Sequence, residues 1–261
     1  MRYGVCSGIE NPERVAAAAA AGFDYIECGF CSLSRGEDET VNAFARALEK
    51  SGIACEAANG FLPRDLAIID RPENREPIRA YIEKGMERGA KLGLKTVVFG
   101  SSAARRVPEG FDFGEGFCQL CEFLRGTASP IAEKYGITLV IEPLRIAECN
   151  IINTVKEGVM LAAASGCANV HGLADLYHMV CEGDTCEDIR DLQGRIRHAH
   201  ISNPAGDGKL NRVYPLGRDE YDYKGFIGAL TDAGCPRCSV EAGLRDYVTE
   251  YPAAAALLKS L

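Results

Sequence analysis

The chain has 261 residues, with 29 Lys and Arg against 37 Asp and Glu, and a formal net charge of −8. This acidic balance argues against nucleic acid and against an anionic membrane surface, because both partners attract clustered basic side chains. The hydrophobic fraction of 47% is ordinary for a globular protein, and no segment is apolar over the length of a membrane span. The first residues show no basic segment followed by a long apolar run, so we expect a cytoplasmic protein.

Short apolar segments alternate with amphipathic segments along the whole chain. This alternation predicts eight strands and eight helices. The expected strands are 2–7, 24–30, 53–59, 96–101, 137–142, 169–175, 196–202 and 238–242. The expected helices are 12–21, 38–51, 74–92, 115–135, 154–165, 185–193, 222–233 and 249–260.

The order of these segments predicts the architecture. Glycine follows several expected helices, as in KSG, KLG and KYG, where a left-handed helix cap is needed. No Pro-rich or Ser-rich linker interrupts the alternation, so we expect one domain over 1–261, folded as a (β/α)8 TIM barrel. An open doubly wound sheet is the alternative, but its phosphate-binding GxGxxG turn does not appear after the first expected strand, where the sequence is CSGIENP.

Four successive expected strands end on residues that bind metals. These residues are Glu142, Asp175, His200 and Glu241. The carboxyl ends of barrel strands converge on the barrel axis and form the active site in α/β barrels. Three carboxylates placed together would repel each other unless a cation lay between them. Three oxygen ligands and one nitrogen ligand favour Mn²⁺, Mg²⁺ or Co²⁺, so we expect one such divalent cation here.

Other polar residues flank the same strand ends. His178 lies three residues after Asp175, and Arg212 follows the seventh strand, where a cation suits substrate oxygens. His198 points to the same side of its strand as His200 but lies one layer deeper. We interpret it as an interior histidine or as a hydrogen-bond partner of the ligand.

The segment that follows the fourth expected strand has two interpretations. Its residues 100–102 read GSS, and Arg105 and Arg106 come soon after. Hydroxyl and guanidinium groups together suit a phosphate, but the same residues are common in solvated loops. We favour the solvated loop.

The twelve cysteines suit a reducing compartment, where free thiols act as small hydrophobes. Two CxxC pairs, Cys118/Cys121 and Cys235/Cys238, could together bind a structural zinc ion. The first pair looks like one face of a helix, and the two pairs are much further apart than in compact zinc motifs. We therefore favour cysteines without a metal.

Five strings carry a family resemblance: VFGSSAARRVPEGF, IEPLRIAECNIINT, ADLYHM, HAHISNP and SVEA. They resemble the sugar isomerase/epimerase superfamily with the xylose-isomerase-like barrel, in particular ketose 3-epimerases of the tagatose and psicose type and hydroxypyruvate-isomerase-like proteins. The resemblance implies one divalent cation, Mn²⁺ first, on Glu142, Asp175, His200 and Glu241. It also implies a sugar substrate and a possible homodimer or homotetramer.

The resemblance also assigns roles around the expected cation. Glu142 and Glu241 would be the acid/base pair, while Glu148, His178 and Arg212 would bind the substrate. A proton next to a sugar carbonyl is too weakly acidic to leave unaided, and a metal ion stabilises the cis-enediolate that forms when it does. Strands five and eight lie across a barrel from each other, so the two glutamates could exchange protons on opposite faces of the sugar.

Three other functions fit parts of the sequence. A metal-dependent dehydratase or lyase acting on a modified sugar or glycoside could use the same ligands and bases. A non-catalytic accessory barrel is also possible, but the intact set of ligands argues against it. A barrel endonuclease for abasic sites would need three zinc ions and more than the four histidines present, so we do not favour it.

Overall fold

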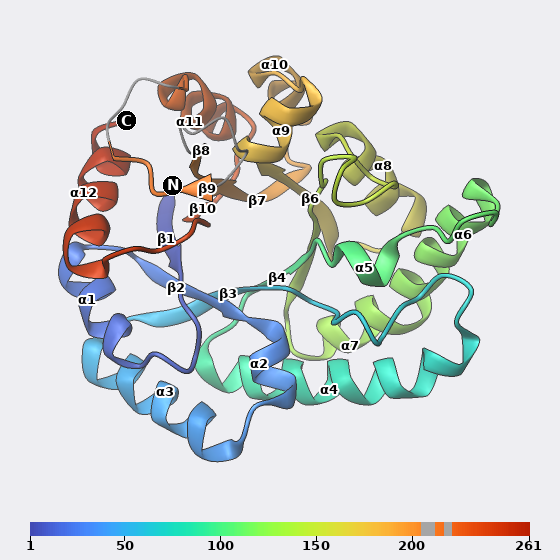
Figure 1. The fold of residues 1–261 in the computed structure, drawn as a ribbon, viewed down its shortest axis with the longest axis horizontal. Helices are drawn as coiled ribbons and strands as arrows, with labels where there is room; N and C mark the ends of the chain where they lie inside the picture. Colours follow the sequence, from blue (N-terminus) through green and yellow to red (C-terminus); the bar gives the residue numbers. More distant parts are fainter. Residues whose placement is uncertain (205–211, 217–220) are drawn as a thin grey trace.

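The computed structural model describes residues 1–204, 212–216 and 221–261. Eight parallel strands close into a barrel in the order β1-β10-β7-β6-β5-β4-β3-β2, and helices surround this ring (Figure 1). The predicted (β/α)8 barrel is confirmed, and every strand end lies within two residues of its predicted place. The barrel strands are β1 (Arg2–Cys6), β2 (Tyr25–Gly29), β3 (Ala54–Asn59), β4 (Thr96–Phe99), β5 (Thr138–Ile141), β6 (Val170–Asp175), β7 (Ile196–Ile201) and β10 (Arg237–Val240).

The helices follow the prediction less closely than the strands. Three short helices, α2, α5 and α9, were not predicted, and α10 is shorter than the expected 185–193. A small two-stranded sheet, β8 (Asn203–Pro204) with β9 (Arg212–Val213), lies after β7. The α-helices are α1 (Glu13–Ala21), α2 (Phe30–Arg35), α3 (Asp38–Ser51), α4 (Arg75–Leu92), α5 (Ser102–Arg105), α6 (Phe113–Phe123), α7 (Ser129–Lys134), α8 (Val155–Ser165), α9 (Leu176–Glu182), α10 (Cys186–Arg190), α11 (Tyr223–Asp232) and α12 (Tyr247–Ser260).

The expected helix 115–135 is interrupted. A π-helical turn at Leu124–Ala128 separates α6 from α7. Pro130, at the start of α7, has no N–H to donate, and its ring would collide with the carbonyl four residues earlier. The wider turn accommodates the proline, and the carbonyl of Gly126 accepts a hydrogen bond from Arg79 instead (3.3 Å).

The inside of the barrel is filled in layers. Val98, Val140 and Leu173, from β4, β5 and β6, form a separate fully buried cluster. Because side chains alternate along a strand, residues two positions further on point inward as well, one layer nearer the carboxyl ends. Two of those positions are Glu142 and Asp175. The apolar layer therefore forms the floor beneath the predicted site.

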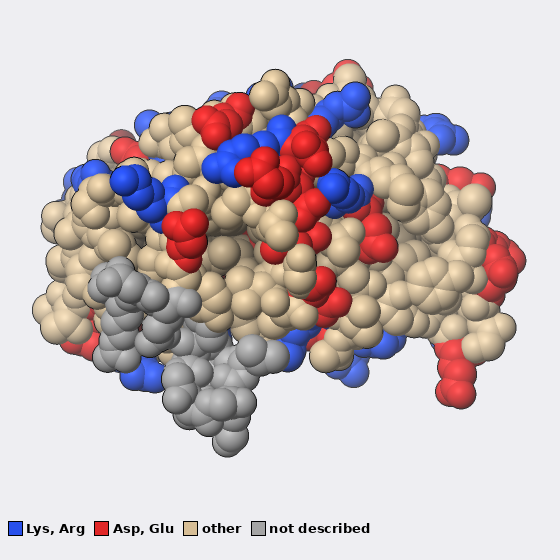
Figure 2. Space-filling model, turned by 90° about the horizontal axis from the view of Figure 1, so that it is seen from above, with Lys and Arg blue, Asp and Glu red and all other residues tan. Residues whose placement is uncertain are grey.

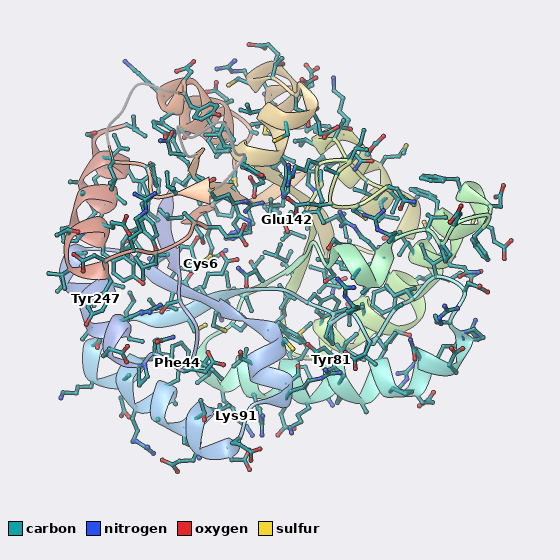
Figure 3. All side chains as sticks on the ribbon, in the orientation of Figure 1. Cys6, Phe44, Tyr81, Lys91, Glu142 and Tyr247 are labelled. Carbon is teal, nitrogen blue, oxygen red and sulfur yellow. The ribbon has the colours of Figure 1, made fainter. Side chains whose placement is uncertain are left out.

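The outside of the molecule carries both signs of charge. Figure 2 shows acidic and basic side chains interspersed on one face, with apolar and neutral surface between them. Figure 3 places Cys6 and Glu142 within the ring of strands and Lys91 on the outer side of α4. Among the described residues, no helix combines the length and the apolar character that a membrane crossing requires.

Candidate active site and metal centre

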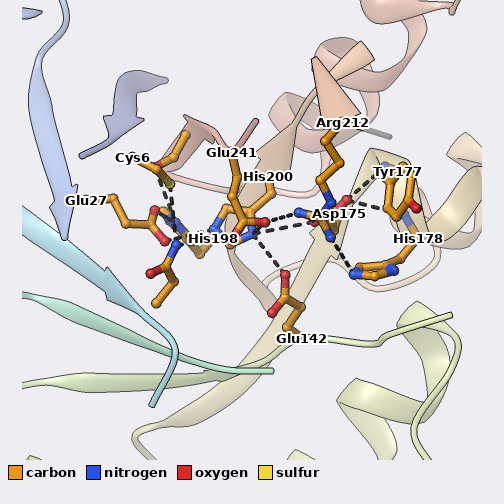
Figure 4. Close-up of polar contacts among 12 residues, drawn as sticks. Cys6, Glu27, Glu142, Asp175, Tyr177, His178, His198, His200, Arg212 and Glu241 are labelled. Carbon is orange, nitrogen blue, oxygen red and sulfur yellow. Dashed lines mark hydrogen bonds and ion pairs between the residues drawn. The ribbon is translucent and has the colours of Figure 1, made fainter. Parts of the chain in front are cut away.

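Four side chains meet at the carboxyl rim of the barrel (Figure 4). They come from the ends of neighbouring strands: Glu142 follows β5, Asp175 ends β6, His200 lies in β7 and Glu241 follows β10. One donor atom from each lies within 4.8 Å of the others. The Nδ1 atom of His200 lies 3.0 Å from Glu142 Oε1, 3.3 Å from Glu241 Oε2 and 3.6 Å from Asp175 Oδ2. The structure therefore brings the four predicted ligands together, while their role as ligands stays a prediction.

The charges of this cluster fit a cation. Burial disfavours the charged form of His200, yet its pKa is well above the ordinary value because the carboxylates of Glu27, Asp175 and Glu142 attract the imidazolium. Asp175 Oδ2 is buried without a hydrogen bond, although Arg212 Nη1 lies 3.0 Å away. A buried carboxylate oxygen without a hydrogen bond is rare, and a divalent cation at this position would be a suitable partner for it. The donor set of three carboxylates and one imidazole suits Mn²⁺, Mg²⁺ or Co²⁺.

The two carboxylate oxygens of Asp175 have different roles. Its Oδ1 atom accepts hydrogen bonds from the backbone N–H groups of Tyr177 (2.8 Å) and His178 (3.3 Å), which caps the N-terminus of α9. The cap holds the carboxylate in one orientation, so Oδ2 faces the cluster. The same cap explains the unpredicted helix α9, because aspartate after a strand is a helix-start signal.

Glu142 has room for its carboxylate because residue 100 is glycine. A Cβ atom on Gly100 would lie 2.0 Å from Glu142 Oε2 and 3.1 Å from its Cδ. The backbone φ of Gly100 is not in the left-handed region, so the glycine is needed here for space. The glycine at the end of β4 thus determines where the neighbouring carboxylate can lie.

The interpretation of the segment around Arg105 as a solvated loop is wrong for this residue. Its side chain is fully buried and donates to the carbonyls of Phe99 and Glu142, both at 2.7 Å. These bonds connect the ends of β4 and β5 beneath the cluster. Arg106 is exposed and donates to the carbonyl of Glu148 (2.7 Å). The two arginines therefore fix backbone rather than form a shared anion site.

Glu241 is held from two sides. Asn59, at the end of β3, donates to Glu241 Oε1 (3.0 Å), and Arg212 contacts Glu241 Oε2. The backbone N–H of Gly243 donates to the carbonyl of Arg212 (3.1 Å), so the segment after β10 also fixes Arg212. Asn59 was not predicted, because an asparagine at a strand end has no distinctive signal in the sequence.

His178 and Arg212 present donors to the same space. The backbone N–H of Arg145 donates to Nδ1 of His178 (3.0 Å), which places the ring proton on Nε2, beside Arg212 Nη2. Burial lowers the pKa of His178, so the ring is neutral. Arg212 stacks over Tyr177, with its guanidinium carbon 4.6 Å from the ring centre. His178 and Arg212 therefore lie side by side in the lining of the cavity above the cluster.

Glu148 lies at the edge of the same space. Its Oε1 atom accepts a hydrogen bond from Arg145 Nε at 2.7 Å, and its side chain is 37% exposed. The cavity above the cluster measures about 500 Å³, which is within the range of small-molecule sites. It is lined by Asn59, Gly60, Ser101, Ser102, Glu142, Leu144, Glu148, His178, Arg212, Glu241, Ala242 and Gly243.

A second, deeper group of polar side chains lies behind His200. Glu27 of β2 is fully buried, and its two carboxylate oxygens contact His200 Nε2 (2.9 Å) and His198 Nε2 (2.8 Å). His198 therefore lies in the interior behind His200, as the sequence suggested, and shares the carboxylate of Glu27 with it. Glu27 was not predicted as part of the site, although a lone carboxylate in the apolar strand YIECG is a signal that sequence reading could have used.

The two CxxC pairs differ in their burial. All twelve are free thiols. Cys235 and Cys238 are buried, whereas Cys118 is exposed on α6. Among the described residues, the groups that could hold a metal ion include one cysteine, Cys6, and neither CxxC pair.

A closed parallel barrel with carboxylates and an imidazole at its carboxyl rim is the arrangement of an α/β-barrel enzyme. Residues 15–261 match the xylose isomerase-like TIM barrel family, and the chain belongs to this family. An L-ribulose 3-epimerase of Mesorhizobium japonicum is 31% identical over 232 residues, which are 86% of this chain and 72% of that protein. A 2-oxo-tetronate isomerase of Pectobacterium atrosepticum is 25% identical over 245 residues, 89% of each chain.

A solved structure agrees with the fold. A crystal structure of D-psicose 3-epimerase, obtained in the presence of D-fructose, superposes with a TM-score of 0.81 at 20% identity. The match covers 100% of this chain and 98% of that one. The named relatives support an isomerase or epimerase as the class of this enzyme.

Proposed function

We propose that this protein is a divalent-metal-dependent sugar epimerase or isomerase that acts on a ketose or a ketose-like substrate through a cis-enediolate. The observation that carries the proposal is the meeting of Glu142 and the half-buried Glu241 in one cluster with the buried Asp175 and His200. The relatives named as a ribulose 3-epimerase and a 2-oxo-tetronate isomerase support the reaction class.

In this proposal Glu142, Asp175, His200 and Glu241 hold one ion, with Mn²⁺ first among the candidates. A bound divalent ion acts as a Lewis acid toward a carbonyl oxygen and stabilises negative charge that develops there. The chain's own contribution is the geometry. Arg105 and Gly100 fix the place of Glu142, and the helix cap fixes that of Asp175.

Glu142 and Glu241 are the proposed proton carriers. Their strands, β5 and β10, are three places apart in the ring of eight, slightly less than the opposite positions expected from the sequence. One carboxylate removes the proton next to the carbonyl, and the other returns a proton from the other side. Asn59 leaves Oε2 of Glu241 directed toward the cluster and the substrate space.

Three residues are proposed to bind the sugar. Nε2–H of His178 and the guanidinium of Arg212 donate to the carbonyl or a neighbouring hydroxyl oxygen. Glu148, at the edge of the cavity, accepts from a hydroxyl further along the chain of the sugar. Together they orient the substrate so that its acidic C–H faces the glutamates.

The test uses the variants Glu142→Gln and Glu241→Gln with a panel of free ketoses in D₂O. Each change removes a proton carrier and keeps the volume, so turnover should fall by about 10²–10⁴-fold or more while the circular dichroism spectrum is unchanged. The wild-type protein should place deuterium on the carbon next to the carbonyl, and chelation should abolish this exchange. Glu122→Gln, an exposed change on α6, is the control.

Two results would contradict the proposal. Turnover close to wild type in either glutamine variant would remove that glutamate from the chemistry. A dehydrated or cleaved product in place of an epimer or an isomer would favour the dehydratase or lyase instead.

A further inference from the structure

We propose that Glu27 is a positioning residue of the metal centre, which holds His200 so that Nδ1 faces the other three ligands. This inference rests on the proposed function, because it concerns the ion that Glu142, Asp175, His200 and Glu241 would bind. Glu27 itself does not face the substrate cavity.

The position of Glu27 is unusual for a carboxylate. It lies in β2, its side chain is 0% exposed, and its neighbours in the strand are apolar or cysteine. The inside of such a barrel is ordinarily filled by branched aliphatic side chains. A carboxylate persists there only when its oxygens have strong partners, because burying an unpaired charge is costly.

Both oxygens of Glu27 have such partners. Oε1 lies 2.9 Å from Nε2 of His200, and Oε2 lies 2.8 Å from Nε2 of His198. A carboxylate only accepts, so each imidazole must donate an N–H from Nε2. His198 Nδ1 is buried without a hydrogen bond, which agrees with a neutral ring that carries its proton on Nε2.

The consequence for His200 is a fixed tautomer. With the proton on Nε2, the lone pair of the neutral ring is on Nδ1, and a metal ion binds a lone pair. Nδ1 is the atom that lies 3.0–3.6 Å from the oxygens of Glu142, Glu241 and Asp175. Carboxylates behind a metal-binding histidine commonly fix the ring in this way.

His198 completes the arrangement from the far side. It holds the second oxygen of Glu27, and Ser239 Oγ lies 3.5 Å from the same Nε2. Tyr25 shares a hydrogen bond of 2.8 Å with Ser239. The histidine pair RHAHIS thus has two different roles, one at the ion and one behind the carboxylate that orients it.

Glu27→Gln is the decisive variant because it keeps the shape and removes one acceptor. The amide oxygen can accept from one histidine, but the amide NH₂ then meets the N–H of the other. If the NH₂ faces His200, the proton of that ring must move to Nδ1, where it blocks the ion. If it faces His198, that ring must place an N–H on Nδ1, where it has no acceptor.

The experiment measures Mn²⁺ binding by isothermal titration calorimetry. Wild-type protein should bind one ion per chain, and Glu27→Gln should bind it about 10–100-fold more weakly. Glu56→Gln is the matched control: Glu56 is 13% exposed and pairs with Arg2 and Arg237 at the other end of the barrel, so its loss should not change the affinity for Mn²⁺.

A second measurement does not depend on the variant folding. Nitrogen NMR of the wild-type protein loaded with Mg²⁺, which is diamagnetic, should show the proton of His200 on Nε2. A proton on Nδ1 would overturn the proposal, and so would equal Mn²⁺ affinity in Glu27→Gln. Two ions per chain would also overturn it, because Glu27, His198 and His200 would then be ligands of a second ion. If wild-type protein binds no divalent ion, the proposed function fails together with this inference. If wild-type protein binds one ion and Glu27→Gln binds it equally well, only this inference fails.

Discussion

Replacing Gly100 with alanine should damage the active site and leave the fold intact. The new Cβ would lie 2.0 Å from Glu142 Oε2, whereas ordinary contacts begin at 3.4 Å, so the carboxylate must move by about 1.4 Å (3.4 − 2.0). Elsewhere a flexible carboxylate would turn aside at little cost. Here a displacement of about 1 Å in a reacting group costs about 10²-fold in rate, so we expect kcat to fall by about 100-fold.

The assay pairs turnover with Mn²⁺ titration and thermal unfolding. Gly100→Ala should lose activity and bind Mn²⁺ more weakly, with little change in Tm. Gly228→Ala is the control, because Gly228 lies in α11 with nothing within 4 Å of the added Cβ. That variant should keep full activity and gain about 0.5–1 kcal/mol of stability. Turnover and Mn²⁺ affinity within twofold of wild type in Gly100→Ala would refute the reasoning.

Four further outcomes can be measured. Arg212→Met should raise KM for the ketose while Mn²⁺ affinity stays equal or improves, because the guanidinium competes with the ion for carboxylate oxygens; weaker Mn²⁺ binding would contradict this. Burial lowers the pKa of His200, but the Glu27 carboxylate outweighs burial and raises this pKa above 6.5. Metal-free protein should therefore lose stability as the pH rises through the pKa of His200 in the folded state, and Mn²⁺ should remove this loss in thermal melts. Burial raises the pKa of Glu27, but His200 and His198 outweigh burial and hold this pKa below 4.5. The stability that the ionised carboxylate contributes above pH 4.5 should therefore be lost on acidification, which thermal melts at decreasing pH would measure. Arg105→Met removes the donor to the buried carbonyl of Glu142 and leaves the carbonyl of Phe99 with only the backbone N–H of Glu142 (3.3 Å), so it should cost about 1–3 kcal/mol in urea unfolding; no destabilisation would contradict the anchoring role.

The sequence was sufficient for the barrel because strand periodicity and strand ends are local signals. Glu142, Asp175, His200 and Glu241 could be selected because each breaks an apolar segment at the same relative place. Their convergence then followed from barrel geometry alone.

The supporting residues were not accessible in the same way, because their roles depend on contacts between distant segments. Glu27 meets His198 across a separation of 171 residues, and Asn59 meets Glu241 across 182. Gly100 is significant only for the space it leaves, which no local pattern reports. Arg105 looked like a surface arginine, because its burial depends on the carbonyls that the closed barrel presents.

Different strands of the barrel supply the proposed ligands and the residues that support them. All four proposed ligands come from the contiguous arc β5-β6-β7-β10, whereas β2 and β3 supply Glu27 and Asn59, which touch the ligands from behind or beside. Exchanging the loop that begins at Gly60, after β3, could therefore reshape the cavity wall while every proposed ion-binding side chain keeps its place on its own strand. The arc β5-β6-β7-β10, which carries the proposed ligands, has no such freedom, and this makes the loop after β3 the natural starting point for redirecting this enzyme toward another substrate.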